Sequence, residues 1–303
     1  MEPTRQTVLC HPVAMACGSF VTLCGTEAAH LAQRKGDSRY GDMHSRPASQ
    51  MKGIPMNRQA QPRQRGSYGI DAPFVFGALA VLIVACLAMS IVAVVNSGSV
   101  GPLLPVLFML TVAAFVLHTT LRGKFVVWAE LLDTLGLRGD ERILDLGCGR
   151  GGVLLLAAQR LTTGRAVGVD LWRSADQSGN SAEATRRNAI AEGVADRVDL
   201  HTGDMTALPF EDDGFDVVVS SLAIHNIRGT AGREKAISEA VRVLRPGGRL
   251  MIADIRVTQQ HQAQLAKLGM NNVARSRLGW QFWWGGPWAA TRLVTATKPE
   301  RRN

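Results

Sequence analysis

The longest apolar stretch of the chain extends from residue 72 to residue 121 and contains no Asp, Glu, Lys or Arg. A polar turn at residues 96–99, Asn-Ser-Gly-Ser, divides it into two runs, each about as long as a helix that crosses a bilayer. The pattern predicts membrane helices near residues 73–95 and 103–121. The length of the first run, and the second run directly after it, argue against a cleaved signal peptide.

The charged flanks of this helical pair predict its orientation. Arg63 and Arg65 precede the first run and Arg122 and Lys124 follow the second, whereas the turn between the runs is uncharged. Lys and Arg concentrate on the cytoplasmic side of membrane helices, so the rest of the chain is expected in the cytoplasm, attached to a two-span membrane segment. The second run contains His118 and can also be a re-entrant or interfacial segment.

Residues 1–71 mix Gly, Ser, Gln, Pro and charged residues without helical or strand periodicity, which is typical of a disordered basic tail. The expected organisation is therefore this tail, a transmembrane helical hairpin over residues 72–121 and a folded domain over residues 122–303. Met51 and Met56 are alternative translation starts, and N-terminal sequencing of the native protein would distinguish them from Met1.

Apolar strands alternate with amphipathic helices from residue 138 onward. The runs ERILDL, AVGVD, VDLHTGD, FDVVVSS and RLMIADI are the expected strands, with helices between them. This alternation predicts an α/β fold with a parallel sheet buried on both faces. After a helix near residues 258–268, two strand-like runs at 273–284 and 289–298 are joined by Gly-Gly-Pro, so the sheet should end in an antiparallel hairpin.

Composition argues against two classes of partner. More than half of the net charge of +9 lies in residues 1–65 and at the C-terminus, and no basic stripe with interleaved aromatic residues runs through the folded part, so no nucleic acid is expected. The five cysteines lack the paired spacing of a zinc site, and no carboxylate trio for magnesium is evident. No metal is therefore expected either.

A glycine-rich loop follows the first expected strand. In the run LDLGCGRGG at residues 144–152, Gly147, Gly149 and Gly152 occupy the first, third and sixth positions of the dinucleotide-binding pattern. Glycines here let the backbone approach a ligand closely, and the N-terminus of the next helix offers free N–H groups. Both NAD and S-adenosylmethionine can use such a loop.

Three acidic residues distinguish between these two ligands. Asp145, just before the first glycine, would repel a pyrophosphate but can engage the cationic amino acid part of S-adenosylmethionine. Asp170 ends the second strand, from which a carboxylate accepts hydrogen bonds from ribose hydroxyls. Asp204 follows the third strand, where it can accept from an adenine amino group while Met205 packs on the ring. This pattern disfavours an NAD-dependent oxidoreductase, which also needs a second nucleotide-binding half.

Residues 138–299 resemble the class I S-adenosylmethionine-dependent methyltransferases, in particular the small-molecule branch that includes ubiquinone and menaquinone C-methyltransferases. The resemblance rests on LDLGCGRGG, GVD ending at Asp170, GDM at 203–205, FDVVVSS and VLRPGGRL, which occur in this order along the domain. It implies a Rossmann-like seven-stranded sheet with an antiparallel last strand, and S-adenosyl-L-methionine as cofactor.

The resemblance also implies which residues bind the cofactor. The glycines would face its methionine part, Asp170 the ribose, Asp204 and Met205 the adenine, and two serines after the fourth strand would border the transferable methyl. The expected cofactor-binding residues are Asp145, Gly147, Gly149, Gly151, Asp170, Leu171, Asp204, Met205, Ser220 and Ser221.

One candidate catalytic residue is His225, which lies just beyond the fourth strand at the edge where open α/β sheets bind ligands. It can take a proton from a phenol or similar acceptor during methyl transfer, and the alternative is a hydrogen-bonded loop histidine.

The stretch at residues 171–180 is longer and more polar than the corresponding link of the quinone enzymes. Trp172 within it either covers the adenine or packs on the next helix.

Four tryptophans cluster on the expected terminal hairpin. Alternate strand positions share one face, so Trp284 and Phe282 would line an acceptor pocket, touch lipid headgroups or pack in the core, while Trp283 points the other way.

Taken together, these features predict a metal-independent enzyme that transfers a methyl group from S-adenosylmethionine to a small-molecule or lipid-like acceptor at the membrane. A membrane-bound sensor or scaffold that binds the cofactor without turnover fits the same residues, and a product assay distinguishes the two. The sequence does not specify the acceptor, the methylated atom (O, C or N) or the oligomeric state.

Overall fold

The structure is a computed structural model that describes residues 65–301. Most of the expected basic tail, including both alternative start positions, lies outside the described residues. The last seven residues of that tail, 65–71, are described, and they pack against the folded domain through hydrogen bonds such as the one from the Ser67 amide to the Asn188 side chain, 2.8 Å long.

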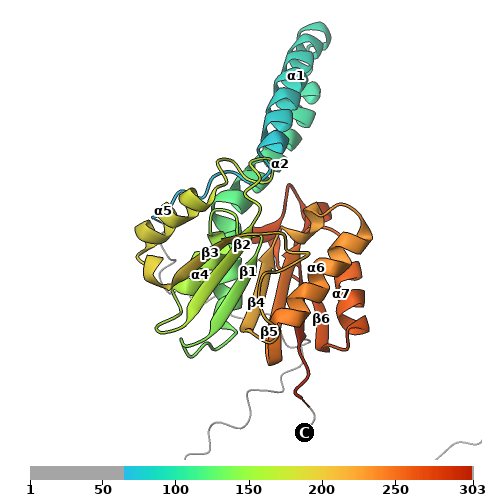
Figure 1. The fold of residues 1–303 in the computed structure, drawn as a ribbon. Coiled ribbons are helices and arrows are strands. Elements are labelled where there is room, and N and C mark those ends of the chain that lie inside the picture. The colour runs from blue at the N-terminus through green and yellow to red at the C-terminus, as the bar shows by residue number, and fades with distance from the viewer. Residues whose placement is uncertain (1–64, 302–303) are drawn as a thin grey trace, which may run out of the picture. The chain divides into compact units, whose positions relative to one another are not determined.

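A single seven-stranded sheet forms the centre of the domain (Figure 1). Its strand order is β3-β2-β1-β4-β5-β7-β6, and β7 alone runs antiparallel to its neighbours β5 and β6. The expected α/β fold with an antiparallel last strand is therefore confirmed. The strands are β1 (Arg142–Leu146), β2 (Arg165–Asp170), β3 (Val198–Thr202), β4 (Phe215–Ser221), β5 (Leu244–Asp254), β6 (Asn271–Arg277) and β7 (Arg292–Thr297).

Helices cover both faces of this sheet and bury its apolar strands. One core unites α3 and α4 with residues such as Ile143 and Val217, and the other unites α6 and α7 with residues such as Leu144 and Val218. Successive residues of a strand thus enter opposite cores, which is why the middle of β4, residues 217–219, is an unbroken apolar run. The helices of the domain are α3 (Lys124–Asp133), α4 (Gly152–Ala158), α5 (Ala182–Glu192), α6 (Thr230–Val243) and α7 (Thr258–Lys267).

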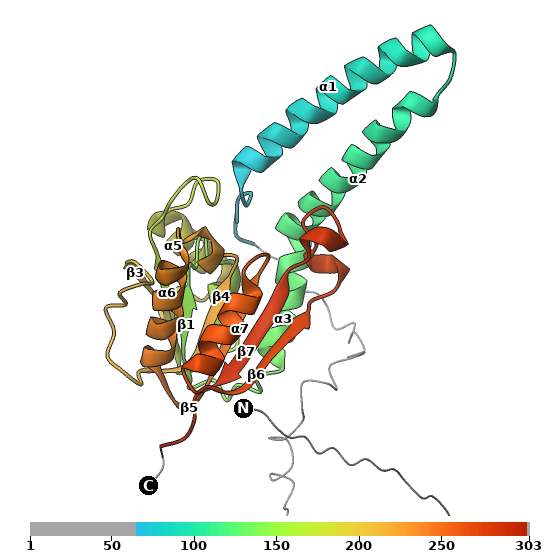
Figure 2. The same ribbon diagram turned by 90° about the vertical axis from the view of Figure 1, so that its right-hand side faces the viewer.

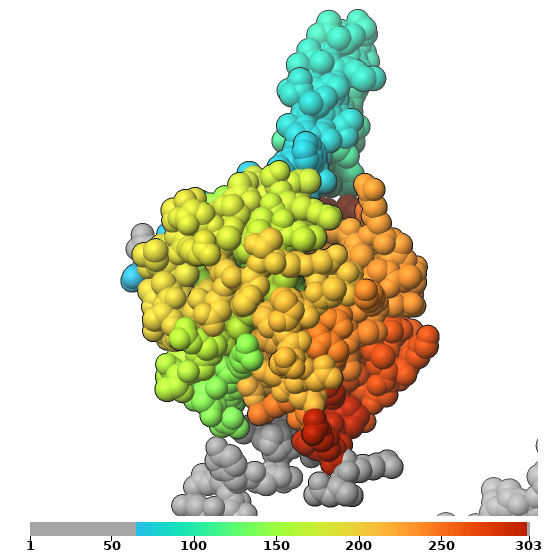
Figure 3. All heavy atoms as spheres, viewed as in Figure 1, coloured from blue at the N-terminus to red at the C-terminus, as the bar shows by residue number. Residues whose placement is uncertain are grey.

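A helical hairpin precedes the domain. Helix α1 (Pro73–Ser97) and the continuous helical segment Gly101–Asp133 are each long and apolar enough, by length and composition, to cross a membrane. The second segment comprises α2 (Leu104–His118), a π-helical turn (Thr119–Gly123) and α3, so one helix extends from the hairpin into the domain. Most side chains of α1 are exposed, and Figure 3 shows them uncovered on the face in view.

The end of the chain differs from the expected pair of long strands. Strand β6 stops at Arg277, and the segment before β7 contains two short 3-10 turns, η6 (Trp280–Phe282) and η7 (Pro287–Ala289). Gly279, Gly285 and Gly286 interrupt the strand geometry because all three adopt positive φ. The expected strands are therefore too long, yet Phe282 and Trp284 pack with the same core cluster while Trp283 packs on Phe115, as the alternation predicted. Figure 2 shows this segment lying beside α2 and α3.

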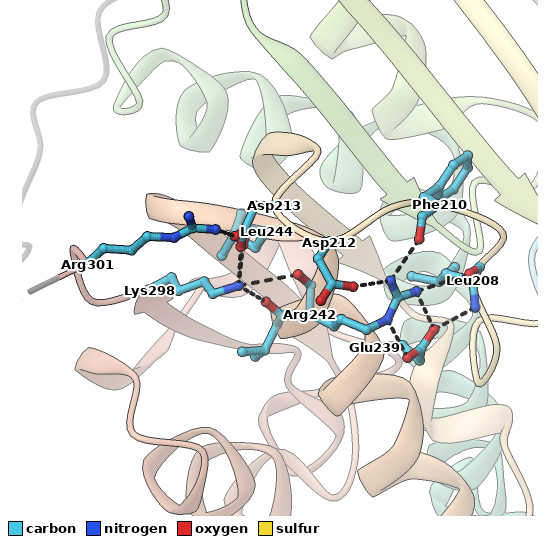
Figure 4. Close-up of polar contacts among 10 residues, drawn as sticks. Leu208, Phe210, Asp212, Asp213, Glu239, Arg242, Leu244, Lys298 and Arg301 are labelled. Carbon is cyan, nitrogen blue, oxygen red and sulfur yellow. Dashed lines mark hydrogen bonds and ion pairs between the residues drawn. The ribbon is translucent and has the colours of Figure 1, made fainter.

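A polar network fixes the loop between β3 and β4, which carries Asp204 and Met205, to helix α6. Arg242 donates to the carbonyl oxygens of Phe210, at 2.7 Å, and Leu208, at 3.1 Å (Figure 4). Glu239 accepts from the Leu208 amide at 2.8 Å and also binds Arg242. The contact with Arg242 lowers the pKa of the Glu239 carboxyl more than burial raises it.

A lysine from the end of the chain caps the same helix. The Lys298 ammonium donates to the carbonyl oxygens of Val241, Arg242 and Leu244 at the C-terminus of α6, and it pairs with Asp213 at 2.7 Å (Figure 4). A cation at this end of a helix satisfies carbonyls that lack intrahelical donors. The strand that follows the tryptophan-rich segment is thereby tied to the loop that borders the site.

Candidate functional site

A cavity of about 540 Å³ opens at the carboxyl ends of β1, β2 and β4. The glycine loop forms its floor, and the loops after β2, β3 and β4 form its sides. Its other wall comes from the segment before α1 and from helix α3. The residues that line the cavity include Asp71, Lys124, Phe125, Trp128, Asp145, Gly147, Gly149, Asp170, Leu171, Gln177, Asn180, Asp204, Met205 and Ser221.

The glycines of the loop are required by close approaches and by backbone conformation. Gly147 has φ +73, and a Cβ there would lie 2.3 Å from the Ala223 Cβ. Gly149 has φ +51, and a Cβ there would lie 2.6 Å from the side-chain oxygen of Gln177. Gly151 precedes α4 as its N-cap with φ +87 and does not line the cavity. These positions favour glycine whatever ligand the loop binds.

Asp145 is a buried carboxylate with little compensation, because contact with the Leu154 backbone lowers its pKa less than burial and Asp170 raise it. Its residue is 1% exposed, and neither side-chain oxygen has a partner in regular hydrogen-bond geometry among the described residues. Burial, and then the neighbouring Asp170 carboxylate, raise the pKa of Asp145 to about 8. An unpaired acid costs free energy in such a place, so its presence at the cavity wall suits a cationic ligand group.

Asp170 is instead held by the backbone. One carboxylate oxygen accepts from the Gly149 amide at 2.8 Å, and the other accepts from the Trp172 amide at 2.6 Å. The Asn180 side chain donates to it at 3.3 Å, a contact that motif reasoning missed. Asp170 thus supports the glycine loop while it lines the cavity.

Trp172 does not line the cavity. Its indole N–H donates to Thr202 of β3 at 2.8 Å, and the ring packs against the core cluster. Leu171, which is 44% exposed, lines the cavity in its place. Asp204 and Met205 line it from the next loop.

The two serines that end β4, rather than following it as expected, point in different directions. Ser220 donates to the Leu146 carbonyl oxygen at 2.9 Å and does not line the cavity. Ser221 lines it and accepts from the Trp128 indole at 2.8 Å. Successive side chains of a strand alternate between faces, so Ser220 and Ser221 cannot both face a ligand here.

His225 lies beside the cavity rather than in its lining. Its Nδ1 is 2.5 Å from an oxygen of the buried Asp254, although the angle is not that of a regular hydrogen bond. Burial raises the pKa of Asp254, but the contacts with His225 and His261 outweigh it and leave that pKa below its ordinary value. The predicted role of His225 as a base remains a prediction.

The segment before α1 supplies site residues that sequence reasoning missed. Asp71 lines the cavity and accepts from Lys124 at 2.5 Å, from Thr120 at 2.9 Å and from Gln177 at 2.9 Å. Gln177 in turn accepts from the Arg150 amide at 2.8 Å, so the contact reaches the glycine loop. In the sequence alone, Lys124 is recognisable only as a basic residue that flanks the second apolar run, and not as a residue of the site.

Cys148 is not a plausible nucleophile. Cys148 is only 5% exposed. Burial raises the pKa of its thiol well above the ordinary value, and the Asp145 and Asp170 carboxylates raise it further. A protonated, buried thiol reacts poorly. Within residues 65–301, no group of His, Cys, Asp and Glu is arranged to hold a metal ion.

Comparisons with known proteins agree with this geometry. A family model described as "Methyltransferase domain" matches residues 144–252. This match begins in β1, includes the glycine loop and ends in β5, and it agrees with the methyltransferase resemblance that the sequence motifs indicated.

The relatives found include proteins named as methyltransferases. The ubiquinone/menaquinone biosynthesis C-methyltransferase UbiE of Roseobacter denitrificans is 38% identical over 44% of this chain and 50% of that protein. Methyltransferase GfsG of Streptomyces halstedii is 37% identical over 42% of each. The chain therefore spans about half the length of these curated relatives.

A solved structure, geranyl diphosphate C-methyltransferase from Streptomyces coelicolor A3(2), aligns at 19% identity. The alignment covers 56% of this chain and 78% of that one, with a TM-score of 0.46.

The first testable prediction concerns the proton on Asp145. Because its pKa is about 8 in the empty site, binding a cationic amino acid group should release this proton. Affinity for S-adenosylhomocysteine should therefore rise with pH between 6 and 8, by up to about 10-fold per pH unit, and level off above. Calorimetry in buffers of different ionisation enthalpy measures both the affinity and the released proton.

Asp145→Asn is the control for this pH dependence. The variant carries no titratable group at this position, so its affinity should be low and almost independent of pH in this range. A wild-type protein whose affinity does not change with pH would contradict the assignment of Asp145.

The second prediction concerns the ion pair between Asp71 and Lys124, whose side chains are 15% and 10% exposed. Asp71→Asn leaves the Lys124 ammonium without its carboxylate, a change that costs about 3–5 kcal/mol in buried pairs. We expect a lower melting temperature and an affinity for S-adenosylhomocysteine reduced at least about 10-fold.

The exposed pair of Arg138 and Asp140 provides a matched control, because both side chains are more than half exposed. Asp140→Asn should change neither quantity. The double variant Asp71→Asn/Lys124→Gln should recover part of the loss, since no unpaired charge remains. Equal effects of Asp71→Asn and Asp140→Asn would rule out the role given to Asp71.

Proposed function

We propose that the protein transfers a methyl group from S-adenosylmethionine to a small-molecule or lipid-like acceptor at a membrane. The observation that carries this proposal is Asp145, an unpaired carboxylate buried at the wall of a cavity beneath a glycine loop. Of the ligands that use such loops, S-adenosylmethionine presents a cationic amino acid end that favours ionised Asp145, whereas a dinucleotide presents a pyrophosphate, which offers this acid no opposite charge.

The lining residues fit the cofactor part by part. Asp145, Gly147 and Gly149 would bind the methionine end, and the oppositely charged Asp71 and Lys124 match its ammonium and carboxylate groups. Asp170 and Leu171 would contact the ribose. Asp204 would accept from the adenine amino group beside Met205. When bound, S-adenosylmethionine supplies a methyl group on a positively charged sulfur.

The end of the cavity near Trp128 and Ser221 is where we place the acceptor. Phe125 and Trp128 border this end from the buried core, and the hydrogen bond between the Trp128 indole and Ser221 holds the ring in position. The protein would contribute alignment and exclusion of water, while the acceptor atom attacks the methyl carbon opposite to the departing sulfur. The proton of the acceptor then needs a base.

We propose His225 as that base, with Asp254 as its positioning residue. The two lie within 2.5 Å of each other at the end of β4 and β5, beside the cavity loop that contains Leu222 and Ala223. A carboxylate that contacts Nδ1 orients an imidazole and leaves Nε2 available to take a proton. Reaching the acceptor would require a rotation of the histidine side chain toward the cavity.

Membrane attachment is the second part of the proposal. Two apolar helical segments, α1 and Gly101–Asp133, support it by their length and exposed apolar surface, and the basic residues on their outer flanks favour a cytoplasmic domain. Phe125 and Trp128 belong to the same continuous helix as α2. An acceptor that is itself in or near the bilayer, such as a quinone precursor or a lipid, would approach the cavity from the base of the hairpin.

The third prediction tests the activity and the source of the acceptor. The full-length protein in detergent is incubated with radiolabelled S-adenosylmethionine and either extracted membrane lipids or a cytosolic extract. Label should enter the lipid fraction, and Asp170→Asn should reduce incorporation, because it weakens support of the glycine loop.

The outcomes of this assay separate the alternatives. Label in cytosolic compounds alone would disprove a lipid-like acceptor. Cofactor binding by calorimetry without any labelled product would instead favour a membrane-bound sensor. Mass spectrometry of a labelled product identifies the acceptor and shows whether O, C or N is methylated.

The fourth prediction concerns His225. Loss of a general base reduces turnover by about 100-fold or more, so His225→Ala should lower kcat by this order and leave the affinity for S-adenosylhomocysteine unchanged. His201→Ala, at a histidine that packs edge-on against Phe210, is the control and should leave kcat unaltered. Full turnover by His225→Ala on an identified acceptor would show that the base is another group.

A further inference from the structure

We propose that residues 278–291, here called the tryptophan loop, insert into the lipid bilayer beside α2 as a third membrane-contacting element. This inference rests on the proposed membrane attachment and extends it from the helical hairpin to the catalytic domain itself. The loop joins β6 to β7 and contains all four tryptophans of the C-terminal region.

The charge pattern of the loop is that of a membrane-inserted segment. No Asp, Glu, Lys or Arg occurs from residue 278 to residue 291, while Arg277 and Arg292 flank it directly. These two arginines are register partners across β6 and β7, so both lie at the base of the loop. Arginines at the headgroup level, with tryptophans beyond them, are the usual arrangement at a bilayer surface.

The loop follows α2 toward the tip of the hairpin. Trp280 stacks on His118 with ring centroids 5.0 Å apart, Trp283 packs on Phe115 at 5.9 Å, and Trp288 packs on Phe108 at 6.1 Å. Between His118 and Phe108 the helix rises about 15 Å, at 1.5 Å per residue. If α2 lies in the bilayer, the loop that follows it over this distance lies there as well (Figure 2).

The backbone of the loop is suited to a nonpolar environment. The Trp284 amide donates to the Ala289 carbonyl oxygen at 3.0 Å, and the Thr291 amide donates to that of Phe282 at 3.0 Å. Thr119 of the π-helical turn donates to the Trp283 carbonyl oxygen at 2.6 Å. Lipid cannot satisfy backbone polar groups, so a non-helical segment tolerates the bilayer only when protein partners do so.

The outer face of the loop is apolar and exposed. Trp280 is 50% exposed and Trp288 is 68% exposed, and both continue the exposed surface of α2, where Leu107 and Leu110 are 61% and 49% exposed. This continuity favours lipid as the occupant, because one uncharged surface extends over the loop and the hairpin. A tryptophan ring, apolar with one N–H, suits the boundary between headgroups and acyl chains.

The fifth prediction uses tryptophan fluorescence of the full-length protein in vesicles of phosphatidylcholine and phosphatidylglycerol with brominated acyl chains. Bromine quenches indoles within the acyl region. Trp288→Phe should lower the quenched fraction of the emission relative to wild type. Trp172 donates to Thr202 near the cavity, where bromine does not reach. Trp172→Phe therefore removes unquenched emission and should raise the quenched fraction.

A reporter on α1 separates this inference from membrane attachment itself. Leu82 is 58% exposed on α1, and Leu82→Trp should add quenched emission if the hairpin is inserted. Quenching of the Leu82→Trp reporter together with an unchanged quenched fraction in Trp288→Phe would overturn insertion of the loop and leave the anchor standing. If the Leu82→Trp reporter is not quenched and Trp288→Phe does not change the quenched fraction, both loop insertion and membrane attachment are overturned.

A second copy of the chain is the other possible occupant of this face. In that case Trp288→Phe would change the oligomeric mass in detergent by mass photometry and would leave bromolipid quenching unaltered. That result would also overturn insertion of the loop.

Discussion

The carboxylate of Asp71 joins the three parts of the chain on which the site depends. It directly precedes α1, and its partners Thr120 and Lys124 lie where α2 continues into α3, so one ion-paired group fixes both bases of the helical hairpin. Through Gln177 the same carboxylate reaches the backbone of the glycine loop. Because breaking a largely buried ion pair is costly, the hairpin and the loop cannot shift independently. The wall of the cavity is therefore as rigid as the base of the hairpin.

The cavity is acidic in a chain that is basic overall, and its acids are not equivalent. Asp170 accepts from two backbone amides and Asp71 is paired with Lys124, so both carboxylates are compensated before a ligand binds. Asp145 has no regular hydrogen bond among the described residues, and its raised pKa favours the protonated acid near neutral pH until a cation binds. A cationic ligand thus stabilises the site by ionising Asp145, while an anionic ligand meets Asp145 and Asp170 side by side.

Sequence patterns predicted the elements whose signal is local. The strand and helix periods placed β1 to β5, and the motif order implied the antiparallel end of the sheet. The segment 65–71 could not be predicted, since its order comes from distant partners such as Glu192 and Asn188 and its own composition is that of a tail. Strand alternation predicts that Ser220 and Ser221 face opposite sides, yet motif transfer placed both at the ligand. The tryptophan-rich segment has strand-like composition, but three glycines at positive φ bend it away from the sheet.

The antiparallel course of β7 has a consequence for how the domain would meet a membrane. Arg292 at the start of β7 is the antiparallel register partner of Asp254 at the end of β5. The segment before β7 therefore emerges at the same edge of the sheet as the cavity. The hairpin leaves from this edge as well, because Asp71 and Lys124 line the cavity. With the proposed attachment, this ligand-binding edge would face the bilayer. An acceptor dissolved in the bilayer would then approach the cavity from the edge at which it opens, and this arrangement is the reason for proposing a lipid-like acceptor.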